Sequence, residues 1–283
     1  MKYFAFPHEY FTKNFKLKDN QNIIDYIKFS KPYDTIQYFR KLEDAEFIVP
    51  LIEENVLECG KFNSKYALGD EYLSYSAALL CSDKLLQRKK LDELGELNVK
   101  YYWYSKTFNK NPYVIKNRTS SLNKGVRIIT KDLEEKSWNI INKMVDGLKT
   151  ENNRLNFFNY NYYNKPYFFE EYIDGDHYEM DGVVISMGMY FTGNLIKQHW
   201  KDDKIVWYEK VDDHILSMEV GEIVCKILRL FQLNKCGFSM EFIKSKNGFK
   251  IIEVHARLGE EVEGKNYKEA IGADLEAKLF EYL

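Results

Sequence analysis

The sequence has few cysteines and no long apolar segment. It contains four cysteines among 283 residues, and none belongs to a CxxC pair of the kind that binds zinc or carries dithiol redox chemistry. No apolar run reaches the roughly 18 residues that a membrane-spanning helix needs. The N-terminal segment MKYFAFPHEYFTK also lacks the continuous apolar core of a signal peptide. We therefore expect a protein of the reducing cytoplasm, with no membrane partner.

An excess of charge of either sign is missing as well. The chain has 41 basic and 43 acidic residues, which gives a net charge of −2. General binding to nucleic acid requires a basic surface that displaces counterions, so we do not expect a nucleic-acid partner. Hydrophobic residues make up 45% of the chain and aromatic residues 16%, which is typical of a globular protein. At roughly 100–200 residues per domain, the length allows one large domain or two small ones.

The first part of the chain has the pattern of an α/β unit. FIVP (47–50) is a β-rich run that a proline stops. The next ten residues, LIEENVLECG, have the pattern of a helix that ends at Gly60. Strand followed by helix is the repeating element of α/β folds. A long apolar stripe at helical spacing from Val220 to Phe231 predicts a further helix late in the chain.

A second helix and two strands follow the first unit. The segment SDKLLQRKKLDELG (82–95) has helical periodicity, with Ser82 able to cap its N-terminus and Gly95 suited to the position after its last turn. PYVIK (112–116) and VRIIT (126–130) predict two strands joined by a polar loop.

Two strands near the C-terminus bring glutamates together in one register. If Lys246, Asn247 and Gly248 form a three-residue hairpin loop, Glu241 lies directly opposite Glu253 on one face. Facing carboxylates repel, whereas a cation between them reverses the sign, and Mg²⁺ prefers oxygen ligands. A two-residue loop would place the two glutamates on opposite faces and remove this site. The alternative interpretation is a hydrated polar face.

Two more segments have compositions that suit a nucleotide. Lys116 ends a strand and precedes the small, polar loop NRTSSLNKG (117–125), which can hold phosphate oxygens through amides, hydroxyls and charge. The alternative is a solvated hairpin loop, because neither GxxxxGK[ST] nor GxGxxG occurs. FFEEYIDGDH (168–177) is a strand that ends at a glycine turn, where backbone groups can bind a planar base edge. Taken without its context, the segment is better explained as an ordinary edge strand and turn.

Taken in order, these segments resemble the ATP-grasp superfamily of carboxylate–amine ligases, which includes D-alanine–D-alanine ligase, biotin carboxylase and carbamoyl phosphate synthetase. The resemblance is carried by DAEFIVPLIEE (44–54), SAALLCSDKLLQRKKLDELG (76–95), VIKNRTSSLNKGV (114–126), FFEEYIDGDHYEMDGVV (168–184), GFSMEFIKSKNGFKIIEVHARLG (237–259) and GADLEAKL (272–279). Each motif is loose, and their order makes the resemblance specific.

The resemblance implies an α/β fold of the α+β ATP-grasp type. An N-terminal α/β lobe would span residues 1–81, and the ATP-grasp domain would span residues 82–283. Within that domain, a small lid subdomain of about 98–168 and a C-terminal metal-hairpin subdomain of about 174–283 would clamp ATP between antiparallel sheets.

The resemblance also implies the site residues, with ATP and Mg²⁺ as cofactors. ATP phosphates would be bound by Lys84 and Lys116 and by the loop residues Ser120, Ser121, Lys124 and Gly125. The adenine edge would be met by Glu170, Glu171 and Ile173, and the ribose by His177. The metal would be held by Glu241, Glu253 and His255. Arg257 would stabilise the transferring phosphoryl group and the tetrahedral intermediate, with Lys116 as the second catalytic residue.

Two positions depart from the common pattern. His177 stands where the family often has glutamate at the ribose, and it can still bond a ribose hydroxyl. His255 stands where the family usually has asparagine at the metal, although Mg²⁺ prefers oxygen to imidazole nitrogen. His255 is open to several interpretations: binding through water, contact with phosphate, preference for Mn²⁺, or a weakened second metal site. Glu260 and Glu261 have no assigned role.

The predicted function is an ATP-dependent ligase that activates a carboxylate as an acyl phosphate and joins it to an amine. Its partners would be small-molecule carboxylates and amines. Two alternatives stay open: an ATP-grasp kinase that phosphorylates a small molecule, and a non-catalytic ATP-binding module. Neither the identity of the acid and amine nor the oligomeric state follows from the sequence.

Overall fold

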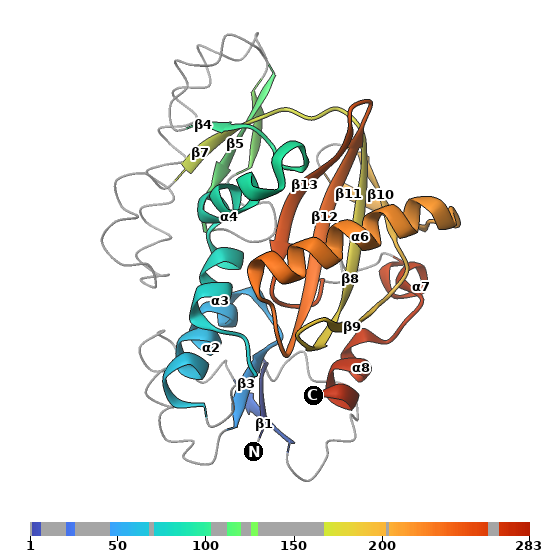
Figure 1. Ribbon diagram of the computed structural model, residues 1–283. Coiled ribbons are helices and arrows are strands. Elements are labelled where there is room, and N and C mark those ends of the chain that lie inside the picture. The colour runs from blue at the N-terminus through green and yellow to red at the C-terminus, as the bar shows by residue number, and fades with distance from the viewer. Residues whose placement is uncertain are drawn as a thin grey trace.

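Three β-sheets organise the protein in a computed structural model (Figure 1). The structure describes residues 2–6, 21–25, 46–67, 71–102, 112–119, 126–129, 167–201, 204–259 and 266–283. The sheets have three, four and six strands, and helices are interleaved with them along the chain. This mixed α/β architecture with antiparallel sheets confirms the predicted fold class. The division at residue 81 stays a prediction. Within the described ranges, no helix is long and apolar enough to cross a bilayer.

The N-terminal sheet is parallel and leads into the first helix pair. Its strands are β1 (Lys2–Phe6), β2 (Gln21–Asp25) and β3 (Phe47–Pro50), in the order β2-β1-β3. Helix α2 (Glu53–Tyr66) then runs past Gly60, so the predicted helix end there is wrong. A Cβ on Gly60 would lie 2.4 Å from the Cβ of Ala78 in α3 (Tyr75–Ser82). The glycine therefore permits close helix packing.

Helix α4 (Lys84–Leu91) follows α3 almost directly and continues into the 3-10 helix η2 (Asp92–Leu97). Its N-cap is Asp83, whose carboxylate accepts from the backbone N–H groups of the next turn, so Ser82 is the last residue of α3 and not the cap. Gly95 has φ +58°, a conformation that favours glycine, as expected near a helix end.

The four-stranded sheet is antiparallel and small. It consists of β4 (Tyr101–Tyr102), β5 (Tyr113–Asn117), β6 (Arg127–Ile129) and β7 (Tyr167–Glu171), in the order β4-β7-β5-β6. The two strands predicted around the polar loop are therefore confirmed as β5 and β6. Buried Tyr113, Ile115, Ile129 and Phe169 form its apolar cluster.

The six-stranded sheet carries most of the core. Its strands are β8 (Asp176–Ser186), β9 (Met189–Thr192), β10 (Ile196–Lys201), β11 (Lys204–Lys210), β12 (Cys236–Ser245) and β13 (Gly248–His255). Its order is β11-β10-β8-β12-β13, with β9 paired to β8. Helix α6 (His214–Phe231) buries its predicted apolar stripe against residues such as Met180 and Met240. The opposite face, near Val183, meets α7 (Tyr267–Ile271) and α8 (Leu275–Tyr282).

The β12–β13 hairpin reaches the predicted pairing by an unpredicted route. Its loop has two residues, because Ser245 pairs with Gly248. Between Phe242 and Glu241 the register shifts by one, which leaves Ile252 as an extra residue on β13. This β-bulge restores the pairing that a three-residue loop would have given. Glu241 therefore does lie opposite Glu253, and the expectation that a two-residue loop separates them is wrong.

Candidate nucleotide and metal site

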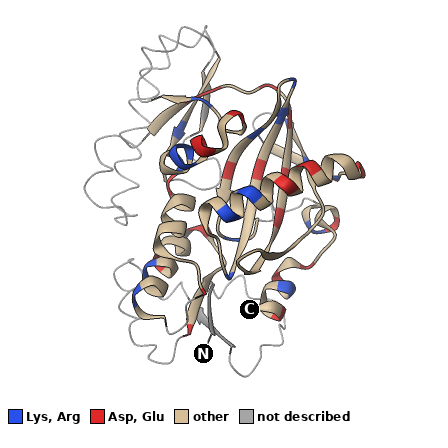
Figure 2. Ribbon diagram, viewed as in Figure 1, with Lys and Arg blue, Asp and Glu red and all other residues tan. Residues whose placement is uncertain are grey.

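Three glutamates form a row across neighbouring strands of the large sheet. Glu241 on β12 pairs with Glu179 on β8 and with Glu253 on β13. Figure 2 shows acidic residues on these strands. Because side chains alternate between faces, the row lies on the face opposite the α6 core. Burial and the charges of its two neighbours raise the pKa of Glu241 to about 7.

Two lysines from different elements meet on the carboxylate of Glu253. The Nζ of Lys84, at the start of α4, lies 2.7 Å from Glu253 Oε2, and the Nζ of Lys116 on β5 lies 3.3 Å from Oε1. Burial raises the pKa of Glu253, but the lysines and His255 outweigh it and hold the pKa well below its usual range. Burial lowers the pKa of Lys84, and the Glu253 carboxylate reverses this and raises it.

Glu170, on β7, is the second carboxylate that Lys116 contacts. Lys116 Nζ lies 3.2 Å from Glu170 Oε2, and Arg88 Nε lies 2.5 Å from Oε1. Burial raises the pKa of Glu170, and the two cations lower it below its usual value. Lys116 therefore bridges the predicted adenine residue and the predicted metal ligand, Glu253.

The other predicted adenine and ribose residues lie where β7 leads into β8. The N–H of Glu171 donates to the carbonyl of Lys100 at 2.9 Å, and the Lys100 N–H donates to the Glu171 carboxylate at 3.1 Å. Ile173 lies in the link between the two strands. His177 on β8 lies beside the Trp200 ring, with centroids 5.3 Å apart. Burial and the nearby charge of Lys116 lower the His177 pKa.

His255 and Arg257 are held by a glutamate from the N-terminal part of the chain. Glu53 Oε2 lies 2.9 Å from His255 Nδ1 and 3.1 Å from Arg257 Nε. His255 Nε2 lies 3.3 Å from Glu253 Oε2. Burial and Arg257 lower the His255 pKa, but the two carboxylates outweigh them and raise it. Burial raises the pKa of Glu53, yet His255 and Arg257 bring it down to about 2.

The histidine therefore presents both ring nitrogens to carboxylates. A metal ligand must offer an unprotonated nitrogen. The geometry of His255 suits an imidazolium that links Glu53 to Glu253 better than it suits a metal ligand.

Glu179 and Asp181 add a buried acidic pair on β8. Glu179 accepts from Gln198 Nε2 at 2.7 Å and from Ser239 Oγ at 3.1 Å. Asp181 accepts from the Gly259 N–H at 3.1 Å and from the Tyr267 hydroxyl. Burial, helped at Glu179 by the charge of Asp181, raises their pKa values to about 8 and about 7.

The N-terminus of α4 is tied to the strand that carries Lys116. Arg118 places its guanidinium on Asp83, with Nε 3.1 Å from Oδ1 and Nη2 2.5 Å from Oδ2. The Lys84 N–H also donates to the Arg118 carbonyl at 2.8 Å. The two lysines are thus fixed relative to each other. Four predicted phosphate-loop residues lie outside the described residues, as do two acids without an assigned role: Ser120, Ser121, Lys124, Gly125, Glu260 and Glu261.

The carboxylates of the row suit one divalent cation, although they do not form a complete metal site by themselves. Among the described residues, no three His, Cys, Asp or Glu side chains are already gathered at metal-binding distance. Glu241 and Glu253 nevertheless face each other in register, and burial together with the charges of Glu253 and Glu179 raises the pKa of Glu241. Two facing oxygen ligands are the kind of donor that Mg²⁺ accepts.

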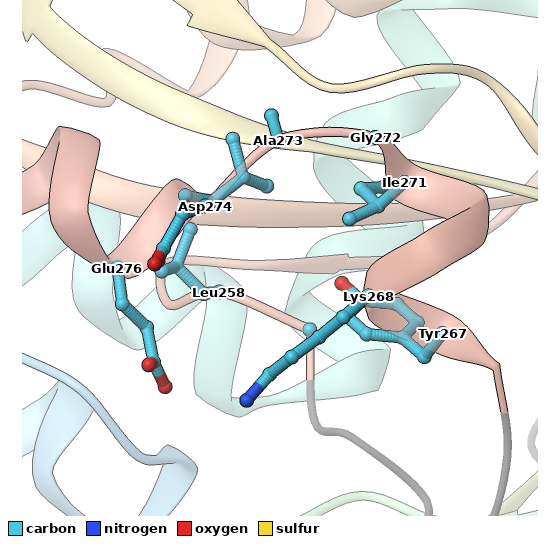
Figure 3. Close-up of a pocket in the computed structure, with 10 residues that line it drawn as sticks. Leu258, Tyr267, Lys268, Ile271, Gly272, Ala273, Asp274 and Glu276 are labelled. Carbon is cyan, nitrogen blue, oxygen red and sulfur yellow. The ribbon is translucent and has the colours of Figure 1, made fainter. Parts of the chain in front are cut away.

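A cavity of about 370 Å³ lies just beyond the cluster. It is bordered by Leu258 and Gly259, which follow Arg257, and by residues of α7 and of the start of α8. In Figure 3 the ammonium group of Lys268 and the carboxylates of Asp274 and Glu276 enter it from opposite sides.

Sequence reasoning missed four residues of this cluster. Glu179 and Asp181 alternate along DHYEMDG with His177, so a period-two pattern on β8 could have found them. Arg88 lies one helical turn after Lys84, a spacing that puts both on one helix face. Glu53 carried no signal beyond its place in the N-terminal motif.

Solved structures share this fold. A biotin carboxylase from Campylobacter jejuni, solved as a β-γ-ATP complex, superposes with a TM-score of 0.65 at 18% identity, covering 93% of this chain and 60% of that chain. An L-amino acid ligase from Bacillus licheniformis superposes with a TM-score of 0.63 at 14% identity, covering 93% of this chain and 64% of that chain. An N5-carboxyaminoimidazole synthetase from Staphylococcus aureus, complexed with ADP, superposes with a TM-score of 0.62 at 15% identity, covering 85% of this chain and 60% of that chain.

At these identities the likeness shows a shared fold and no more. This chain spans 60–64% of the length of those proteins. No protein-family profile and no curated protein sequence matches it.

Proposed function

We propose, on the premise that the chain has the ATP-grasp fold, that it is an ATP- and Mg²⁺-dependent ligase that joins a carboxylate to an amine. The solved structures named above share this fold, as the six sequence segments predicted. ATP would phosphorylate the substrate carboxylate to an acyl phosphate. The amine would then displace phosphate and form an amide bond, with ADP and phosphate as the other products.

One observation carries the proposal. Lys84 on α4, Lys116 on β5 and the paired glutamates of the β12–β13 hairpin, Glu241 and Glu253, form one group on the face of the large sheet. A structural role alone would be served by a single buried ion pair. Two ammonium groups on one carboxylate, next to a second carboxylate of raised pKa, are suited to exchange partners.

Charge explains why the two lysines would change partners when a nucleotide binds. Nucleotide phosphates attract the ammonium groups of Lys84 and Lys116 away from Glu253. Glu241 and Glu253 would then hold Mg²⁺, which, when bound, would neutralise negative charge on the phosphate oxygens. Nucleotide and metal should therefore bind together more tightly than either does alone. Mn²⁺ is compatible with the same oxygen ligands.

Arg257 would act on the reacting groups. Its guanidinium is oriented by Glu53 at Nε and by the Leu258 carbonyl, 2.7 Å from Nη1. A fixed guanidinium near developing negative charge stabilises a transferring phosphoryl group without reorganising. The cavity next to Gly259 is our candidate for the amine acceptor, because basic and acidic side chains border it. A Lys268→Met variant would then raise KM for the amine and leave kcat largely unchanged.

The test is release of ADP that depends on added substrate. A panel of carboxylates and amines is screened with ATP and Mg²⁺, and Glu253→Gln should abolish turnover while ATP still binds. Full activity in that variant refutes the metal assignment. Lys90→Met is the control, because Lys90 pairs with Glu93 on the exposed side of α4.

Product analysis separates the alternatives. Mass spectrometry distinguishes an amide with free phosphate from the stable phosphate ester that a kinase makes. A non-catalytic module would bind nucleotide tightly and form ADP with no carboxylate and amine. His255 favours this second alternative, because it stands at the usual asparagine position and both its nitrogens face carboxylates.

A further inference from the structure

The free edge of the large sheet is held by side chains of α4. β13 is the outermost strand of the sheet on this side. The amide of Gln87 acts there as a strand neighbour: its Nε2 donates to the Val254 carbonyl at 2.8 Å, and its Oε1 accepts from the Val254 N–H at 3.0 Å. Both backbone groups of Val254 on this edge are therefore satisfied by one side chain.

Arg88 binds the β-bulge itself. Its Nη1 donates to the carbonyl of Ile251 at 2.7 Å, and its Nη2 donates to the carbonyl of Ile252 at 2.5 Å. In a regular strand, consecutive carbonyls point to opposite edges. The extra residue at Ile252 turns both toward α4, where a planar guanidinium with parallel donors can reach the two at once.

The same guanidinium also joins the bulge to the small sheet. Its Nε lies on Glu170 of β7, and the Asn98 side chain accepts from Nη1 at 3.3 Å and donates to the Arg88 carbonyl at 2.8 Å. The Arg88 residue is 1% exposed. Each part of the fork therefore has a defined partner in a dry environment.

We propose that Gln87 and Arg88 form an edge clamp, meaning that they are positioning residues that hold the bulge at Ile252 and so keep Glu253 opposite Glu241. The proposal rests on the proposed function, because only there are the two glutamates metal ligands. A slip of one residue along β13 would turn Glu253 to the other face of the sheet. The clamp would therefore set metal affinity without touching the metal.

The decisive variant is Arg88→Lys. An ammonium group keeps a positive charge beside Glu170, but a point charge cannot bond two carbonyls in the fork geometry. Lys90→Met, on the same helix but paired at the surface with Glu93, is the matched control. Mn²⁺, as a paramagnetic substitute for Mg²⁺, is titrated by electron paramagnetic resonance in the presence of ADP.

Arg88→Lys should weaken Mn²⁺ binding by about 10- to 100-fold, the usual effect of losing a partner that orients a ligand. Its affinity for ADP without metal should stay within about twofold of wild type, because the charge near Glu170 is kept. A general loss of stability would not produce this split. Lys90→Met should match the wild type in both.

A second measurement needs no ligand. In the Arg88→Lys variant, hydrogen exchange followed by mass spectrometry should show faster exchange in the peptide that covers 249–255. Helix α6 should stay as protected as in the wild type. Unchanged exchange in that peptide overturns the edge clamp, even if the wild-type protein binds no Mn²⁺ and the proposed function fails. Exchange that rises equally throughout the protein also overturns it.

The two proposals can fail separately. If Glu253→Gln loses Mn²⁺ and Arg88→Lys binds it like the wild type, the metal site stands and the clamp is refuted. If the wild type binds no Mn²⁺ with ADP, the metal site is refuted, and the exchange experiment alone decides the clamp.

Discussion

Glu241 and Glu253 face each other on paired strands, yet the same substitution at each should change stability in opposite directions. Glu253 is surrounded by Lys84, Lys116 and His255, so Glu253→Gln removes the carboxylate that buried Lys84 contacts and leaves Lys116 with Glu170 alone. Breaking a buried ion pair from one side typically costs about 3–5 kcal/mol. We expect a loss of this order in the free energy of unfolding at pH 8, without nucleotide or metal.

Glu241→Gln removes a charge that the fold disfavours. Burial, with Glu253 and Glu179, raises the Glu241 pKa from 4.5 to about 7. That difference corresponds to about 3 kcal/mol at most between the two protonation states. A carboxyl group with a raised folded pKa contributes stability below its unfolded pKa, and this is lost as the pH rises through the folded value. The variant should therefore match the wild type near pH 4.5 and be about 1–3 kcal/mol more stable at pH 8.

The assay is urea unfolding of both variants and the wild type from pH 5 to pH 8, with a chelator present. Each midpoint and slope gives the free energy of unfolding. If both variants changed the free energy of unfolding in the same direction at pH 8, this account of the glutamate row would be refuted. So would a Glu241→Gln difference that does not grow between pH 5 and pH 8.

Three further predictions test other parts of the fold. Gly60→Ala should destabilise the protein by about 1–3 kcal/mol in urea unfolding, because its Cβ would press on Ala78. The control, Gly221→Ala in α6, should stabilise it by about 0.5–1 kcal/mol, because a Cβ there meets nothing within 4 Å. Equal effects of the two substitutions would contradict the packing argument. His255→Asn should cost most stability below pH 6.5 and less as the pH rises through the raised folded pKa of His255, where the imidazolium loses its charge; a constant deficit from pH 5 to pH 9 would show that the links to Glu53 and Glu253 do not depend on charge. Asp83→Asn keeps a good N-cap but removes the carboxylate under Arg118, so it should lower the free energy of unfolding by about 3 kcal/mol, and a neutral result would show that this pair only offsets its own desolvation.

The sequence was most informative where periodicity is local. Alternation from Ile252 to Arg257 correctly put Glu253 and His255 on one face, and the stripe in α6 gave the buried side of that helix. The bulge at Ile252 breaks the alternation before that point, so that Ile251 shares the α6 core with Val254. Turn length was predicted wrongly, yet the Glu241–Glu253 pairing was right. A two-residue loop plus one extra residue at Ile252 gives the same register as a three-residue loop. The bulge is set by Gln87 and Arg88, and Gln87 is 167 residues from the Val254 it bonds, so no local pattern on β13 reveals it.

By itself, then, the sequence determined the types of the strands and helices it predicted and the lysines and glutamates that resemble a nucleotide site. The tertiary structure decided which charges meet. It placed Lys84 and Lys116 on Glu253, and it brought Glu53 to His255 from 202 residues away. The reason is physical: backbone periodicity depends on neighbours in the chain, whereas the partner of a buried charge depends on how separate elements pack and on which register their strands adopt.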